Sequence, residues 1–260
     1  AVVDSQATLI AKWQAVGFVH GVMNTDNMAI SGETIDYGPC AFMDVYDPNT
    51  IFSSIDHGGR YAYGNQPSIA SWNLARFAET LLPLIEVDQN KAIEIATHYL
   101  NAFPQVFQRH YMAEMRAKIG LVDEEESDKE LIAELLDWMY QAKADFTNTF
   151  QELASDYLSD EEKFASEPFK HWFKKWKQRL ARAGQPIDEA KRQMQSVNPF
   201  VIPRNHRVEE ALDAASQRDD LSVMHKLLAA LEKPFERNDA FAEYQAPSDD
   251  TRSYRTFCGT

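Results

Sequence analysis

The stretch that decides the fold reads WQAVGFVHGVMNTDNM at residues 13–28, and TIDYGP follows it at residues 34–39. Apolar residues recur at helical spacing over residues 4–18, so that segment is predicted to be a helix. The periodicity stops at His20. Residues 20–63 hold short apolar runs, Asp-containing turn signals and half of the ten glycines, which predicts loops and short strands. A helix thus leads into an irregular polar segment, where functional residues tend to concentrate.

The remainder of the chain shows the pattern of helices separated by prolines and polar turns. Pro67 opens a predicted helix at residues 68–85, and another follows at residues 88–119. Further helical segments between prolines end near Leu231, and the tail from Asn238 is expected to be extended. We therefore expect a mainly α fold, which is α+β overall because of the short strands in the first quarter.

Two serines mark further helix starts. Ser127 with Glu130, and Ser159 with Glu162, have the spacing of a capping box, in which the serine and the acidic residue satisfy each other's free backbone N–H groups. A helix is therefore predicted to begin at each of these serines.

Composition excludes several classes of protein. No window of the 260 residues approaches the ~18 consecutive apolar residues of a membrane span, so no membrane association is expected. The net charge is −14, with a pI near 4.9, which makes a general nucleic-acid binder a poor fit because phosphate contacts need a basic face. Two cysteines, Cys40 and Cys258, are too few for a disulfide framework or a cysteine-built metal site. A reducing compartment, the cytoplasm or the mitochondrion of a eukaryote, is the expected location.

The irregular segment holds short polar side chains that could bind a metal ion. Asn24, Asp26 and Asn27 offer amide and carboxylate oxygens, and Asp36 supplies a second carboxylate beside a glycine-bearing turn. Such oxygens suit Mg²⁺, which prefers hard ligands. A simpler interpretation stays open, because Asn and Asp in loops commonly cap helices or form Asx-turns.

The order of these residues favours the metal interpretation. Protein kinases carry His-Arg-Asp-x-x-x-x-Asn and then Asp-Phe-Gly, and use the Asn and the second Asp to hold the metal of a bound nucleotide. Here His20, Asn27 and Asp36 follow in the same order, with Asp36 opening Asp-Tyr-Gly. Val22 stands where the kinase has its catalytic Asp. The pattern therefore predicts a loop that binds metal but lacks the usual base, as in a pseudokinase.

Residues 13–28 and 34–39 together resemble the signature of the selenoprotein O (SelO) family. Members of that family are kinase-fold proteins that transfer AMP, rather than phosphate, to protein hydroxyls. The resemblance is densest in the first 85 residues and spans nearly the whole chain, continuing at residues 42–44, 59–61, 65–67, 198–199, 204–205 and 209–215 and at the cysteine near the C-terminus.

The resemblance implies an architecture. Residues 1–120 would form a protein-kinase-like C-lobe with the catalytic loop and the metal-binding segment, and residues 121–260 a helical C-terminal extension with a redox tail. The family's nucleotide-binding N-lobe, with its Lys, its partner Glu and a phosphate-contacting Arg, is expected to precede Ala1. No Gly-rich or Walker pattern occurs in this sequence. The chain would then be a C-terminal fragment of the family's architecture.

The resemblance also implies roles for three residues. Asn27 and Asp36 would bind Mg²⁺, with Mn²⁺ as the alternative, and through the metal ATP as substrate. Asp26 would be the general base that accepts the proton of a Ser, Thr or Tyr hydroxyl on a protein substrate. ATP binds flipped in this family, so that its α-phosphate faces the acceptor and pyrophosphate leaves. The competing class is a catalytically inactive interaction or regulatory module, and a phosphotransferase is disfavoured by Val22.

The family is further linked to redox regulation through a disulfide between its tail and its activation loop. Cys258 lies in the tail, and Cys40 is the other thiol of the chain, so a Cys40–Cys258 bridge is one hypothesis. The alternative is that Cys40 is a small buried hydrophobe and Cys258 a free thiol. Among the histidines, His20 is expected to order the catalytic loop, and His57 to lie in the activation segment or on the surface.

Residues 170–182 are basic and aromatic. They could dock on an anionic membrane or in the groove of a partner. The interpretation we favour is that Trp172, Phe173, Trp176 and Leu180 pack inward while the charged residues face water.

Overall fold

The computed structural model describes residues 1–156, 158–159, 161–248 and 254–257. The chain forms two compact units. The first comprises residues 1–41 and 48–114 with the tail from Arg255, and the second comprises residues 42–47 and 115–254. The described residues are mainly helical, as predicted, with short strands β1 (Phe18–Val19) and β2 (Ala41–Phe42) pairing in a two-stranded sheet. A kinase-like C-lobe, an absent N-lobe and a domain boundary at residue 120 stay predictions.

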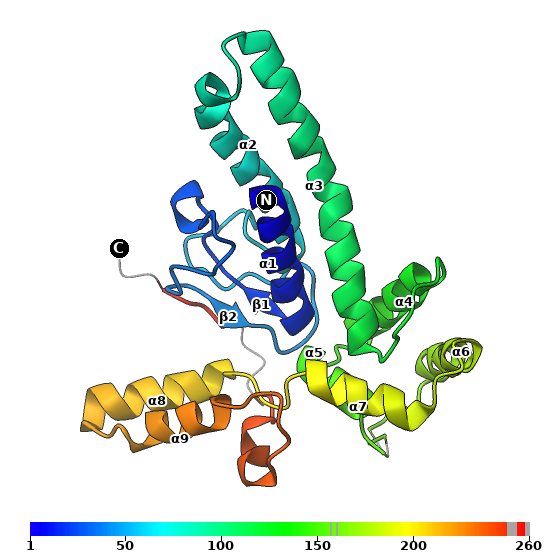
Figure 1. The fold of residues 1–260 in the computed structure, drawn as a ribbon. Coiled ribbons are helices and arrows are strands. Elements are labelled where there is room, and N and C mark those ends of the chain that lie inside the picture. The colour runs from blue at the N-terminus through cyan, green and yellow to red at the C-terminus, as the bar shows by residue number, and fades with distance from the viewer. Residues whose placement is uncertain (157, 160, 249–253, 258–260) are drawn as a thin grey trace. The chain divides into compact units, whose positions relative to one another are not determined.

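The first unit is built on the helices that the periodicity predicts. Helix α1 (Val2–Val16) packs on α2 (Gln66–Ile85) (Figure 1). Helix α3 (Gln89–Lys118) follows, and its residues from Met115 belong to the second unit. Helix α1 ends at Gly17, whose φ of 71° is left-handed and therefore favours glycine. This turn directs the chain into β1 and the irregular segment, which contains the 3₁₀ turns η1 (Thr25–Asn27) and η2 (Tyr63–Asn65).

The second unit consists of helices whose apolar faces meet in pairs. Helix α4 packs on α6, α5 on α7, and α8 on α9. Aromatic rings fill the space between α4 and α6, since Trp138 lies 4.7 Å from Phe169 between ring centroids, and Trp172 stacks on Trp176. The elements are α4 (Asp128–Gln141), α5 (Phe146–Leu153), α6 (Glu167–Arg182), α7 (Ile187–Val197), α8 (Asn205–Arg218), α9 (Ser222–Leu231) and the 3₁₀ helix η3 (Asp239–Tyr244).

Neither predicted capping box forms. Helix α4 does begin next to Ser127, but the hydroxyl of Ser127 donates to Glu125 instead of accepting from the helix. The helix predicted at Ser159 is wrong, since residues 162–165 form turns and α6 begins at Glu167.

The physical reason is a better helix start seven residues further along the chain. Ser166 accepts the backbone N–H of Phe169, and Pro168 in the first turn has its φ preset for a helix. The backbone N–H of Ser159 is satisfied by the carboxylate of Glu152, so nothing requires a helix at that point.

The tail also departs from the prediction of an extended chain. Residues Asp239–Tyr244 form η3, because Phe241 and Tyr244 lie three residues apart and pack together on an apolar cluster that includes Phe200 and Leu227. Burial of these rings favours a helical turn over an extended strand, which would point them apart.

The apolar side chains of the basic segment at residues 170–182 pack inward, as the favoured interpretation predicts. Trp172, Trp176 and Leu180 are buried, whereas Phe173 is partly exposed. The expectation that its charges face water is wrong for Arg179, which is 1% exposed because it pairs with the buried Asp128 at 2.6 Å. A buried charge needs such a partner.

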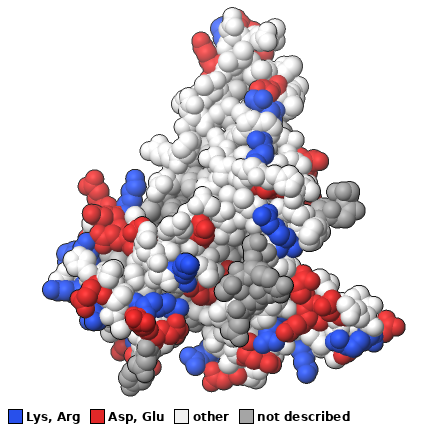
Figure 2. All heavy atoms as spheres, turned by 180° about the vertical axis from the view of Figure 1, so that it is seen from behind, with Lys and Arg blue, Asp and Glu red and all other residues white. Residues whose placement is uncertain are grey.

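No helix among the described residues is both long and apolar enough to cross a bilayer. On the face that Figure 2 shows, acidic and basic side chains are interspersed rather than separated by sign.

Candidate functional site

The irregular segment is organised around the buried side chain of His20. Its Nε2 lies 2.8 Å from the carbonyl oxygen of Ile35, and its Nδ1 lies 3.4 Å from the backbone nitrogen of Val22. These partners fit a neutral ring, in which Nε2–H donates to Ile35 and Nδ1 accepts from Val22. Burial lowers the pKa of His20 and so favours this neutral form. The indole of Trp13 packs against the imidazole with 5.2 Å between ring centroids.

A short hairpin brings the two predicted ligand segments together. Met28 and Thr34 form an antiparallel bridge, and Trp13 Nε1 donates to the hydroxyl of Thr34 over 2.9 Å. Asn27 directly precedes this bridge along the chain, and Ile35 and Asp36 directly follow it. The segments that carry the carboxamide and the carboxylate therefore both continue from the same bridge.

Asn27 is oriented by a bond within its own loop. Its Nδ2 donates to the carbonyl oxygen of Val22 over 3.0 Å, so the amide oxygen is the atom that remains for a cation. Val22 itself is buried, at 8% exposure, so its apolar side chain is turned away from solvent.

Asp36 has an unusual backbone conformation for a residue with a side chain. Its φ is 55°, in the left-handed region that Asp and Asn tolerate better than most residues. Its Oδ1 accepts the backbone N–H of Gly38 at 3.4 Å, so the simpler Asx-turn interpretation also describes this residue. The residue is exposed, and its carboxylate keeps further lone pairs for a cation.

Asp26 lies in the middle of the 3₁₀ turn η1 and is exposed. The turn is held on one side by Asn24, whose Oδ1 accepts the hydroxyl of Tyr61 over 2.6 Å. Asp26 is therefore placed one residue before Asn27, on a turn anchored to a second segment. Its role as a base stays a prediction.

Buried amide side chains hold this loop, and sequence reasoning did not single them out. Gln66 accepts the backbone N–H of His20 and donates to the carbonyl of Phe18, both over 3.0 Å. Asn73 donates to the carbonyl of Met23 over 2.9 Å. The available signal was the presence of polar amides among the apolar positions of the predicted helices, and the residues that share this feature are Gln6, Gln14, Gln66 and Asn73.

The donor set suits Mg²⁺ together with a nucleotide better than a cage made by the protein. Asn27 and Asp36 offer one amide and one carboxylate oxygen, both hard ligands. Among the described residues no group of three or more His, Cys, Asp and Glu converges as a metal site. Mg²⁺ commonly takes one or two protein ligands and completes its octahedron with phosphate oxygens and water, so the residues present fit that ion.

The segment after β2 is ordered by a buried carboxylate and by the tail. Asp56 accepts the backbone N–H groups of Arg60 and Tyr61 over 2.9 and 2.8 Å, and the neighbouring His57 is exposed. Thr256 pairs with the backbone of residues 52–54, and its hydroxyl donates to the carbonyl of Pro39 over 2.7 Å. The described part of the tail therefore lies against the residue that precedes Cys40.

Cys40 is half-buried, and its Sγ lies 3.2 Å from the carbonyl oxygen of Tyr37. Burial raises the pKa of this thiol to about 11, which disfavours the reactive thiolate at neutral pH. Cys258 lies outside the described residues, so a Cys40–Cys258 bridge stays a prediction.

Comparison with known proteins bears directly on this site. The family model described as "Protein adenylyltransferase SelO" matches residues 1–232. Proteins named "Protein nucleotidyltransferase YdiU" are 55% identical to this chain in Bacillus cytotoxicus and 56% identical in Alkaliphilus metalliredigens, in each case over all 260 residues. A relative of the same name from Clostridium botulinum is also 55% identical. The match takes up 53% of each relative, so the chain spans about half the length of the curated relatives it matches. The family match over most of the chain and the agreement of its relatives lead to one conclusion: this chain belongs to the SelO family of protein adenylyltransferases.

Proposed function

We propose that this chain provides the metal-binding and proton-accepting edge of a protein adenylyltransferase, which transfers AMP from ATP to Ser, Thr or Tyr hydroxyls of proteins. The observation that carries the proposal is the pair of hydrogen bonds made by His20, which ties the Asn27 loop to the segment of Asp36. Family membership and the printed names of the relatives support transfer of a nucleotide to protein.

Asn27 and Asp36 would hold Mg²⁺, which supplies charge neutralisation and orientation for the phosphates of ATP. Mn²⁺, a similar oxygen-preferring ion, is the alternative. The resemblance to kinase-fold proteins implies that the remaining contacts to the nucleotide come from an N-lobe.

In this proposal the protein side chains carry out one chemical step, the acceptance of a proton. The carboxylate of Asp26 would accept the proton of the acceptor hydroxyl as its oxygen bonds to the α-phosphorus. The bond from that phosphorus to the bridging oxygen breaks, and pyrophosphate leaves with the electron pair. Phosphoryl-type transfer depends mainly on positioning and charge stabilisation, so one exposed carboxylate beside the metal ligand is sufficient as the base.

The test compares ATP labelled at the α-phosphate with ATP labelled at the γ-phosphate and scores label on protein. It uses the longest open reading frame that contains this chain, with Asp36→Ala as the inactive variant and Glu33→Ala, an exposed carboxylate of the same hairpin, as the matched control. We expect label from the α position alone, lost in Asp36→Ala and retained in Glu33→Ala. Label from the γ position would contradict adenylyl transfer.

A second candidate rests on the buried Val22, which occupies the position of the kinase base. If the loop is retained only as an element of the fold, the protein is a non-catalytic interaction or regulatory module. Absence of α label in the longest open reading frame, with Mn²⁺ and ATP supplied, would favour that module.

A further inference from the structure

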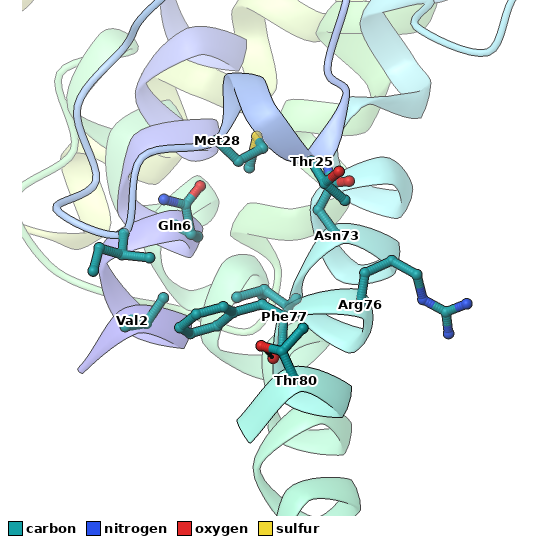
Figure 3. Close-up of a pocket in the computed structure, with 10 residues that line it drawn as sticks. Val2, Gln6, Thr25, Met28, Asn73, Arg76, Phe77 and Thr80 are labelled. Atoms are coloured by element: carbon teal, nitrogen blue, oxygen red, sulfur yellow. Dashed lines mark hydrogen bonds between the residues drawn. The ribbon is translucent and has the colours of Figure 1, made fainter. Parts of the chain in front are cut away.

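A cavity of about 250 Å³ lies within the first unit, against the turn that carries Asp26 and Asn27. Thr25 and Met28, on either side of those two residues, line it, together with residues of α1 and α2 (Figure 3). Its remaining walls are largely apolar and are formed by Val2, Ile30, Leu74 and Phe77.

Two buried amide oxygens of the cavity lining have no partner. Gln6 is 2% exposed and Asn73 is 4% exposed, and both line the cavity. Their amide nitrogens donate to the carbonyl oxygens of Ala29 and Met23, which fixes the orientation of each amide group. The oxygens, Oε1 of Gln6 and Oδ1 of Asn73, have no hydrogen-bond partner in the described part of the chain. Buried acceptors without a donor are costly, so these two atoms indicate a ligand that can donate.

Water alone is a poor occupant of this space. The volume corresponds to several water molecules, each of which takes about 30 Å³ in the liquid. Waters could reach the two oxygens but would leave the walls of Leu74, Phe77 and Met28 in contact with solvent, which the hydrophobic effect disfavours. A flat ring that carries a donor satisfies both the walls and the acceptors.

The charges around the cavity disfavour a cation. None of the residues that line it is acidic. The charged residue at its rim is Arg76, which points away from the cavity in Figure 3 and pairs with Glu79, with its guanidinium also over the ring of Trp72. An ammonium ligand would therefore meet a positive rim and no carboxylate.

We propose that this cavity is a binding site for a neutral aromatic molecule with an N–H or O–H donor, of the indole or phenol class. The donor would bond to the oxygen of Gln6 or Asn73, and the ring would pack between Met28, Leu74 and Phe77. The cavity lining does not include the proposed metal ligands Asn27 and Asp36, but it contacts the turn η1 that carries Asn27. It does not depend on the adenylyltransferase proposal.

The probe is indole, titrated into the 260-residue chain and followed by ligand-observed NMR. Benzofuran is the matched control, because it has the shape of indole but an acceptor oxygen in place of the N–H. One hydrogen bond changes a dissociation constant by roughly three- to tenfold, so we expect benzofuran to bind weaker by that factor. Equal affinities for the two molecules, or no saturable binding of indole, would overturn the proposal.

A pair of variants locates the binding. Thr80 is an exposed residue at the mouth of the cavity, so Thr80→Trp places a large side chain over it without disturbing the core. Leu84 is 82% exposed on the same helix and does not line the cavity, which makes Leu84→Trp the control. We expect indole affinity to fall at least tenfold in Thr80→Trp and to stay unchanged in Leu84→Trp. Binding that survives Thr80→Trp would place indole elsewhere and overturn the assignment.

Discussion

The imidazole Nε2 of His20 lies 2.8 Å from the carbonyl oxygen of Ile35, the residue directly before Asp36. Through its other nitrogen the same ring contacts the backbone of Val22, whose carbonyl accepts from Asn27. One buried side chain therefore sets the register between an amide and a carboxylate that are nine residues apart in the sequence. Rigid support of this kind matters, since small displacements of positioning groups reduce rates strongly.

This geometry predicts a pH-dependent stability. Because burial lowers the pKa of His20 in the folded chain, the unfolded chain binds more protons between that depressed pKa and about 6.5. The contribution of His20 to stability is then fully present above pH 6.5 and is lost as the pH falls through the folded pKa. His20→Gln keeps a donor near Ile35 but does not titrate, so its unfolding free energy should fall less between pH 7.5 and 5.5.

The measurement is urea unfolding of both proteins at several pH values. His57→Gln is the matched control, because it makes the same substitution at an exposed histidine. An identical pH profile for His20→Gln and the wild type would contradict the assigned neutral, buried ring.

Measuring metal binding together with AMP transfer distinguishes the proposed roles of Asp26 and Asp36. Asp26→Asn should lower the rate of transfer from α-labelled ATP by about 10²–10⁴-fold, the usual contribution of a general base, and leave Mn²⁺ binding intact. Asp36→Asn should lower the rate of transfer and also weaken Mn²⁺ binding, since it removes a metal ligand. Binding of Mn²⁺ with ATP is followed by electron paramagnetic resonance on the longest open reading frame. Loss of Mn²⁺ binding in Asp26→Asn would make that residue a ligand instead of a base.

The sequence alone was informative where structure is local. The helices at residues 2–16, 66–85 and 89–118 follow from apolar periodicity and Pro67, which act within a few residues, although the first helix ends at Val16 and not at the predicted residue 18. Ser159 shows the limit, because its capping-box spacing is also local but competes with a better start at Ser166.

The segment that carries the site was predictable, but its supports were not. The bond from His20 to Gln66 joins residues 46 positions apart, and the bond from Asn73 to Met23 joins residues 50 apart. No rule of sequence spacing predicts such hydrogen-bonded pairs, because they depend on how α2 packs against α1 and the segment that follows it. A polar amide on an apolar helix face indicates that the amide makes a hydrogen bond, but it does not identify the partner.

Cys40 should react slowly with alkylating reagents in the folded chain. A thiol with a pKa of about 11 is ionised to about a thousandth at pH 8, whereas a free cysteine of pKa ~8.5 is ionised to roughly a quarter. In a Cys258→Ser variant, iodoacetamide should therefore modify Cys40 about 200-fold more slowly than a cysteine peptide at pH 8. The rate should rise about tenfold per pH unit toward pH 10 and reach the peptide value in urea. A peptide-like rate in the folded chain would show that the thiol is not buried.

The predicted Cys40–Cys258 disulfide has its own test. Thr256 donates to the carbonyl of Pro39, so the described tail ends close to the residue before Cys40. Peptide mapping without reductant, after mild oxidation, should yield a cross-linked pair that Thr256→Pro reduces, because proline removes the backbone N–H that bonds to Phe52. Absence of that cross-link in the wild-type chain would rule the bridge out.

Arg204 should be a larger determinant of stability than an exposed cation of the same unit. Its guanidinium is buried and lies 2.6 Å from both Asp44 and Asp145, so Arg204→Ala would leave two carboxylates without their partner. Breaking a buried pair in this way costs about 3–5 kcal/mol. Lys233→Ala removes the exposed pair with Glu236 and should cost at most about 1 kcal/mol. Urea unfolding measures both variants, and equal losses would mean that the buried carboxylates find other partners or water when Arg204 is absent.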